Sequence, residues 1–233
     1  AGSLTASLVK QFYLTVQPWD KKKLLRHLLT HEEPTLTLVF CRLKRVVDEL
    51  ARMLNGEGIE AHAIHADLGQ GKRNAVMERL RSGKLSVLIA SDLAARGIDV
   101  ENITHVINYD LPEDIELYVH RIGRTARAGA GGVAWSFVTP EQGPLLTAIE
   151  NHINSEIPIQ EYPDFEPGPV PENYREQQLA RESQLEAAMQ RSRYNSSEAP
   201  PKTDVTENKF PGGVVPSKRP PKMLGGRIKS GRR

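Results

Sequence analysis

Short apolar runs alternate with amphipathic stretches over the first 160 residues, and this alternation constrains the fold more than any other feature. Runs rich in β-branched and aromatic residues predict strands at 12–16, 36–41, 60–64, 85–90, 105–108 and 133–138. Apolar residues at helical spacing predict helices at 20–29, 43–54, 70–81, 113–121 and 142–153. Right-handed crossovers join strands that alternate with helices. We therefore expect an α/β fold, a parallel sheet with helices on both faces.

The first two predicted helices carry signals at their ends. Asp20 belongs to a residue type that accepts hydrogen bonds from free N–H groups at a helix start, so we expect it to cap helix 20–29. Gly56 and Gly58 are expected to end helix 43–54. We interpret the charge run Lys21–Lys23 as a solvated helix face.

Composition changes after Tyr162, because ten of the sixteen prolines lie from Pro163 onward. We expect a compact domain over 1–162, a Pro-rich linker over 163–171 and an exposed helix over 172–195. Residues 196–233 carry a net charge of +6 and few apolar side chains, so a largely disordered basic extension is expected there. Such a tail either binds nucleic acid or only keeps the chain in solution.

A single cysteine allows no internal disulfide, which favours a reducing, cytoplasmic setting. The longest apolar stretches, such as 36–41 and 87–90, fall short of the roughly 18 residues of a membrane span. The first residues also lack the pattern of a secretory signal. We therefore expect no membrane contact.

The segment His120-Arg121-Ile122-Gly123-Arg124-Thr125-Ala126-Arg127 is the strongest local signal. Its three arginines recur at a spacing of three, so on a helix they share one face and can converge on one anion. Guanidinium groups bind phosphate through two parallel hydrogen bonds. A solvated basic helix face is the alternative interpretation of the same pattern.

Two further segments place polar groups where ligands meet parallel sheets, beyond the carboxyl ends of predicted strands. The first is 91–99, with Ser91, Asp92, Arg96, Gly97 and Asp99; its alternative interpretation is a helix cap followed by a turn. The second is 65–73, in which Gln70, Lys72 and Arg73 surround a strand-to-helix turn suited to phosphate. It is not a Walker A loop, because Ala66 and Arg73 break that pattern.

Histidine pairs at 27 and 31 and at 62 and 65 have the spacing of metal ligands, but neither pair is accompanied by carboxylates or thiols in the ligand pattern of a zinc site. We therefore expect no metal site. Cys41 lies within a predicted buried strand, which favours an inert packing thiol.

The three segments in this order, together with Leu38-Val39-Phe40-Cys41, resemble the C-terminal RecA-like domain of DEAD-box RNA helicases over residues 5–160. In this resemblance 38–41 corresponds to motif IV, Gln70 with Arg73 to motif IVa, 91–99 to motif V and 120–127 to motif VI. His120 distinguishes this branch of superfamily 2 from those with glutamine there. The dipeptide 140–141, the run 145–153 and Ile157-Pro158 are similar to bacterial members.

The resemblance implies an RNA-dependent ATPase in which two RecA-like domains close around ATP and Mg²⁺. Its implied catalytic residues are Arg124 and Arg127, as fingers on the γ-phosphate, with His120 and Arg121. The implied nucleotide contacts are Asp99, Gly97, Arg124 and Arg127. The implied RNA contacts are Gln70, Arg73, Ser91, Asp92 and Gly97, which touch the backbone without reading bases. Arg96 and Arg121 are the implied contacts to the N-terminal RecA-like domain.

The sequence departs from the family pattern at Leu43, Ser91 and Ala126, and only Leu43 removes a polar contact. These 233 residues contain no Walker A and no DEAD sequence, so Mg²⁺ is expected on an N-terminal partner domain and the isolated chain is expected to lack ATPase activity. The alternative is a non-catalytic RNA-binding or protein-interaction module on a helicase fold.

Overall fold

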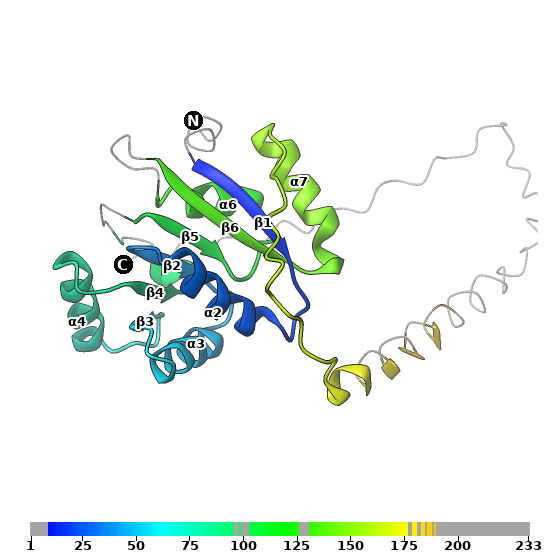
Figure 1. Cartoon of the computed structure of the whole chain (residues 1–233), viewed down its shortest axis with the longest axis horizontal. Helices are drawn as coiled ribbons and strands as arrows, with labels where there is room; N and C mark the ends of the chain where they lie inside the picture. The colour runs from blue at the N-terminus through cyan, green and yellow to red at the C-terminus, as the bar shows by residue number, and fades with distance from the viewer. Residues whose placement is uncertain are drawn as a thin grey trace, which may run out of the picture. The chain divides into compact units, whose positions relative to one another are not determined.

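The computed structural model describes residues 9–95, 98, 103–125 and 131–176, and positions 179, 180, 183, 184, 186, 187 and 189. Its strands form one sheet in the order β1-β6-β5-β2-β4-β3, in which every pair is parallel (Figure 1). The strands are β1 Val9–Thr15, β2 Thr37–Phe40, β3 Ala61–Ile64, β4 Val87–Ala90, β5 His105–Asn108 and β6 Gly132–Val138. The predicted parallel sheet is confirmed.

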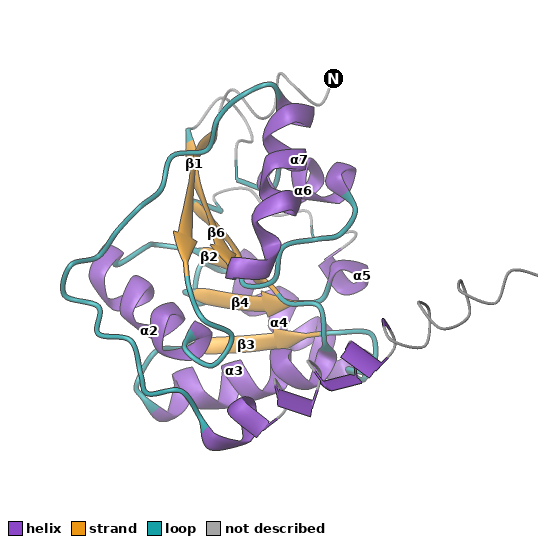
Figure 2. Cartoon of the chain, turned by 90° about the vertical axis from the view of Figure 1, so that its right-hand side faces the viewer, coloured by secondary structure: helices purple, strands orange, loops and turns teal. Residues whose placement is uncertain are grey.

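Helices cover both faces of this sheet, as predicted (Figure 2). They are α2 Lys21–Glu32, α3 Lys44–Gly56, α4 Gln70–Arg81, α5 Asp92–Ala95, α6 Ile115–Ile122 and α7 Gly143–Ile153, with a 3₁₀ turn at Pro140–Gln142. Apolar residues of α2 and α3 form one cluster with one face of the sheet, and those of α4, α6 and α7 form a second cluster on the other face.

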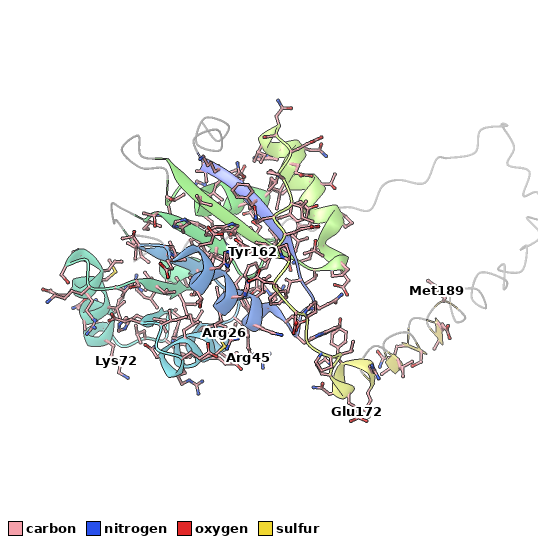
Figure 3. All side chains as sticks on the ribbon, viewed as in Figure 1. Arg26, Arg45, Lys72, Tyr162, Glu172 and Met189 are labelled. Atoms are coloured by element: carbon pink, nitrogen blue, oxygen red, sulfur yellow. The ribbon has the colours of Figure 1, made fainter. Side chains whose placement is uncertain are left out.

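The helices are amphipathic, which explains this layering. Val47, Leu50 and Leu54 of α3 recur at helical spacing and are fully buried against the sheet. The opposite faces carry exposed cations, such as Arg26 on α2 and Arg45 on α3 (Figure 3). Burial of the apolar stripe therefore fixes which side of each helix meets the sheet.

The predicted cap of the first helix is wrong in its chemistry. Asp20 precedes α2, but its backbone already has helical dihedral angles, so its side chain makes no capping hydrogen bond. Its Oδ1 instead accepts from the backbone N–H of Gly168 at 2.9 Å. At the end of α3 the helix includes Gly56, and Gly58 turns the chain with a φ of 84°.

The chain after α7 continues along the sheet edge and then along α2. Ile159 forms a parallel bridge with Tyr13, and the Trp19 and Tyr174 rings meet with their centroids 4.5 Å apart. The segment expected to be a linker, 163–171, thus packs against α2, and the compact unit extends to Arg175. Prolines restrict the backbone without preventing aromatic side chains from packing.

A second unit comprises Glu176–Arg233. Its described positions between 176 and 189 are helical, with Leu179 and Met189 exposed. The extension predicted at 196–233 lies outside the described residues. Within the described part of the chain, no helix has the length and apolar character to cross a membrane.

Candidate functional site

Three neighbouring strands end at one edge of the sheet and bring distant parts of the chain together. Phe40 ends β2, Ser91 and Asp92 follow β4, and Asn108 ends β5. In open parallel sheets this carboxyl edge is where ligands bind. The described residues of segment 91–99 that follow β4, together with Arg121 of segment 120–127, lie around these strand ends.

Arg121 is the central side chain of this edge and is only 2% exposed. Its Nε and Nη2 donate to the two carboxylate oxygens of Asp92 at 2.6 and 2.8 Å. Its Nη1 donates to Asn108 Oδ1 at 3.1 Å and to the carbonyl of Asp110 at 2.6 Å. The guanidinium also lies over the Phe40 ring, 5.0 Å from its centroid. These contacts hold α6 against the ends of three strands.

The structure does not bear out the expected shared face of Arg121 and Arg124. Helix α6 ends at Ile122 and Gly123 follows as its cap residue, so Arg124 lies beyond the helix. Its Nη1 donates to the carbonyl of Ile98 at 3.3 Å, whereas Arg121 points into the sheet edge. Arg121 is buried within this chain, and an ionised group taken out of water requires a partner such as Asp92. The expected contact of Arg121 to a partner domain stays a prediction.

A pocket of about 280 Å³ opens beside this network. It is lined by Phe40, Asp92, Ala95, Leu117, His120, Arg121 and Arg124. His120 is exposed and Arg124 is half-buried. The lining thus combines the guanidinium groups of Arg121 and Arg124 with the carboxylate of Asp92, and guanidinium groups are the side chains that bind phosphate through paired hydrogen bonds.

Lys21 belongs to the same edge and was not recognised as such from the sequence. Its expected solvated position is wrong, since it is 7% exposed. Its Nζ donates to the Tyr109 carbonyl and to Asp110 Oδ1, both at 2.9 Å. The one sequence signal for this pair is the position of Asp110 just beyond a strand end, and nothing in the sequence indicated its partner.

Cys41 follows β2 and is fully buried, as predicted. Burial raises the pKa of its thiol well above the usual value, and the nearby Asp110 carboxylate raises it further. The thiol is therefore neutral and a poor nucleophile.

Four of the predicted RNA contacts, Gln70, Arg73, Ser91 and Asp92, are described and lie around the starts of α4 and α5. Gln70 is exposed and its Nε2 donates to Asn74 Oδ1 at 2.8 Å. Arg73 Nη2 donates to the carbonyl of Ala94 at 2.9 Å, which ties α4 to α5. The carbonyl of Ser91 accepts from the backbone N–H groups of Ala94 and Ala95, and the buried Oγ of Ser91 makes no hydrogen bond within the described residues. Both carboxylate oxygens of Asp92 accept hydrogen bonds from Arg121, and the Asp92 side chain is 25% exposed.

The turn after α6 is anchored by Thr125. Its Oγ1 donates to the carbonyl of Ile103 at 2.6 Å, and the side chain is buried. A Cβ at Gly132, on the first residue of β6, would lie 2.1 Å from that Oγ1. Glycine at this position therefore permits the close approach that holds the end of segment 120–125.

Four of the predicted site residues lie outside the described residues, namely Arg96, Gly97, Asp99 and Arg127. Their expected contacts to the partner domain, nucleotide and RNA rest on the sequence alone.

Comparison with known proteins matches the part of the chain that contains this site. Residues 20–129 match the family described as "Helicase conserved C-terminal domain". The chain is 49% identical over 150 residues to the DEAD-box ATP-dependent RNA helicase CshA of Bacillus subtilis, and this match covers 64% of the chain and 30% of the relative. The chain thus spans about a third of the length of the curated relatives it matches.

Solved structures show the same relationship. A chain of the E. coli DEAD-box protein SrmB, bound to regulator of ribonuclease activity A, matches with a TM-score of 0.61 and 38% identity, over 69% of this chain and 96% of that one. S. cerevisiae Dbp5, bound to RNA and ADP BeF3, matches with a TM-score of 0.60 and 33% identity, over 65% of this chain and 42% of that one.

Proposed function

We propose that this chain supplies one half of an RNA-dependent ATPase. The premise is that it belongs to the DEAD-box ATP-dependent RNA helicases and is their C-terminal RecA-like domain. The other half is an N-terminal RecA-like domain of the same protein. In this proposal ATP hydrolysis is coupled to local unwinding of RNA duplexes or remodelling of RNA–protein complexes.

The pocket at the carboxyl edge is the observation that carries this proposal. Its volume of about 280 Å³ lies just below the roughly 300–1,000 Å³ of sites that enclose a whole small ligand. A pocket of this size, with Arg124 in its lining, fits the phosphate end of a nucleotide. The rest of the nucleotide is then left to the partner domain.

The pocket lining does not suit Mg²⁺. Among its described lining residues only Asp92 carries a carboxylate, and both of its oxygens accept from Arg121. Magnesium in phosphate sites is held by carboxylates together with the phosphate oxygens. We therefore place Mg²⁺ on the partner domain, in agreement with the absence of a DEAD sequence from these residues.

In the proposed reaction Arg124 and Arg127 donate to the γ-phosphate oxygens, where charge develops during transfer. Arg121 is a positioning residue, because its contacts fix the end of α6 just before Arg124. Exposed His120 faces the partner domain together with Arg96, and Asp99 and Gly97 contact the nucleotide. Arginine fingers of this kind accelerate GTP hydrolysis by about 10³–10⁵.

For RNA we propose a backbone-contacting surface at the starts of α4 and α5. The hydrogen bond from Arg73 to Ala94 supports it by joining the two segments that carry Gln70, Ser91 and Gly97. The hydroxyl of Ser91 has no hydrogen-bond partner among the described residues, so it is available to a ligand once that surface opens. The basic tail at 196–233 adds RNA affinity that falls with salt.

The test is RNA-stimulated ATPase activity of the full-length protein with Arg124→Ala or Arg127→Ala. We expect kcat to fall by roughly 10³-fold or more while RNA affinity is retained. Arg26→Ala, on the exposed face of α2, is the matched control and should leave turnover unchanged. Unchanged turnover in the finger variants would refute the catalytic assignment and favour the non-catalytic binding module.

Two further measurements test the assignment of Mg²⁺ to a partner domain and the role of the tail in RNA binding. The 233-residue chain alone should show no steady-state ATP hydrolysis with RNA present, and appreciable turnover would contradict the assignment of Mg²⁺ to a partner domain. Deletion of 196–233 should flatten the dependence of RNA affinity on salt, and an identical slope would exclude the tail from RNA binding.

A further inference from the structure

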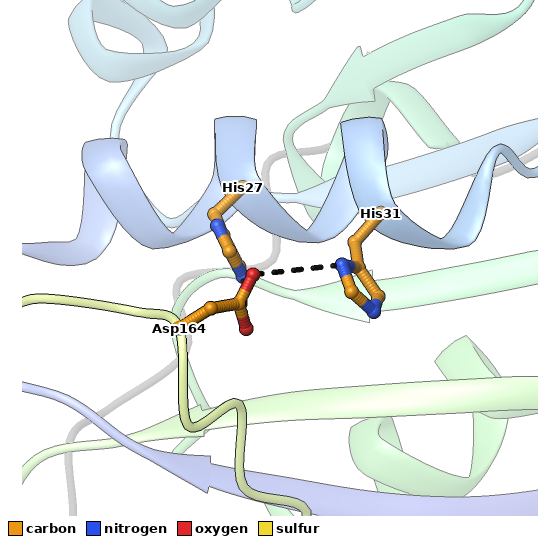
Figure 4. A group of neighbouring side chains, drawn as sticks. All are labelled: His27, His31 and Asp164. Atoms are coloured by element: carbon orange, nitrogen blue, oxygen red, sulfur yellow. Dashed lines mark ion pairs between the residues drawn. The ribbon is translucent and has the colours of Figure 1, made fainter.

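Two histidines and a carboxylate meet on the exposed side of α2, and none of the three belongs to the pocket at the carboxyl edge (Figure 4). His27 and His31 lie four residues apart on α2, so their imidazoles project from one face and stack with centroids 5.6 Å apart. Asp164, more than 130 residues later, comes from the segment that packs along α2. The sequence pattern indicated the histidine pair alone, and the fold places the carboxylate of Asp164 beside it.

The distances suit a shared ion better than hydrogen bonds. His27 Nε2 lies 3.5 Å from Asp164 Oδ1, and His31 Nδ1 lies 3.8 Å from Asp164 Oδ2. Both exceed the 2.7–3.2 Å of ordinary N–H···O hydrogen bonds. Ligand atoms at bonds of about 2.0–2.1 Å in a tetrahedral zinc site lie about 3.3 Å from one another. The three ligand atoms all lie within 4.8 Å of one another, and His31 and Asp164 are exposed, so their side chains have room to adjust.

His27 Nε2 gives independent support, because this nitrogen is buried and has no hydrogen-bond partner within the described residues. A buried polar atom that lacks a partner costs free energy. This nitrogen lies 3.5 Å from Asp164 Oδ1, so a metal ion bound to neutral His27 through Nε2 would also reach the carboxylate.

Aromatic side chains hold the two imidazoles in place. The Tyr162 ring packs edge-on against His27 and His31, with centroid distances of 5.4 and 5.2 Å, and Phe165 packs against His27 at 5.6 Å. The Tyr162 hydroxyl donates to Glu32 Oε1, which fixes that ring in turn. The orientation of the ligands is therefore supported from outside, as is usual at metal sites.

We propose that His27, His31 and Asp164 bind a divalent transition-metal ion of the zinc type and thereby clamp the segment after Tyr162 to α2. Two imidazoles and one carboxylate suit Zn²⁺, whereas Mg²⁺ and Ca²⁺ take oxygen ligands. Exposure of His31 and Asp164 leaves the fourth position to water. The ion adds to the hydrogen bonds of Asp20, Lys23 and Glu32 that already join the two segments.

The experiment is a calorimetric titration of the 233-residue chain with Zn²⁺ after treatment with chelator, together with the visible spectrum of its Co²⁺ form. We expect one ion per chain, a tetrahedral Co²⁺ spectrum that Zn²⁺ abolishes, and a rise in Tm with Zn²⁺. Asp164→Asn and His31→Gln should each weaken Zn²⁺ binding by about 100-fold or more, the upper end of the loss caused by removing a supporting contact. Both residues are exposed, so the fold should survive.

His62→Gln is the matched control, because His62 faces a single carboxylate, Glu60, at 3.3 Å. It should leave Zn²⁺ affinity unchanged. Amide hydrogen exchange at 162–168 should slow with Zn²⁺ in the native chain and not in Asp164→Asn. Equal affinity of native and Asp164→Asn chains, or an affinity lowered as much by His62→Gln, would overturn the proposal.

Discussion

Removal of the Asp92 carboxylate is the sharpest test of how the carboxyl edge is held together. In Asp92→Ala the guanidinium of Arg121 loses two of its hydrogen bonds and its counter-charge while it stays buried. Breaking a buried ion pair in this way costs about 3–5 kcal/mol. The Asp92 side chain is 25% exposed, so water can enter the vacated space. We therefore expect the lower end, about 3 kcal/mol.

The compact unit of 175 residues converts this loss into a measurable shift. At about 2–4 °C per kcal/mol for a domain of this size, Tm should fall by about 6–12 °C. Thermal and urea unfolding followed by circular dichroism measure it. Glu113→Ala is the control. The Glu113 side chain is 79% exposed and that of its ion-pair partner Arg42 is 66% exposed, so this pair should contribute only about 0.5 kcal/mol to stability.

A double-mutant cycle identifies the cause. Arg121→Met alone should cost less than Asp92→Ala, because the Asp92 side chain is 25% exposed and is hydrated more readily than Arg121, which is 2% exposed. The double variant should be no less stable than Asp92→Ala, since the buried charge is then gone. A Tm within about 2 °C of native for Asp92→Ala, or additive losses in the cycle, would refute the argument.

Three further predictions concern the interior. Cys41 should resist alkylation in the folded chain and react only on unfolding, because burial raises the pKa of its thiol; rapid labelling of native protein would contradict this. Burial lowers the pKa of His105 below 6.5, so the unfolded state takes up a proton first and the free energy of unfolding decreases as pH falls below about 6.5. In His105→Gln the free energy of unfolding, measured with urea, should decrease less steeply with falling pH. The same pH dependence in the native chain and the variant would be evidence against this. Gly132→Ala should cost about 1–3 kcal/mol in thermal unfolding because its Cβ overlaps Thr125, whereas Gly131→Ala meets no atom and should be neutral; equal Tm values would exclude the overlap.

The sequence determined the elements of the fold and the edge where the site forms. The helix at 70–81 and the strand at 105–108 were predicted with the bounds that the structure gives them, since local apolar periodicity decides such elements. The start of segment 91–99 was likewise placed correctly, since Ser91 and Asp92 directly follow β4. The reason is that strands that alternate with helices run parallel. These features depend on neighbours in sequence.

Only the tertiary structure decided which side chains meet. Arg121 and Arg124 have equivalent spacing in the sequence, yet one is buried against Asp92 and the other lies beyond the end of α6. Lys21 pairs with Asp110, which is 89 residues away. Asp164 joins His27 because the last segment packs along α2. Periodicity fixes the face of an element, but burial of charge is satisfied by whichever partner the fold brings within reach.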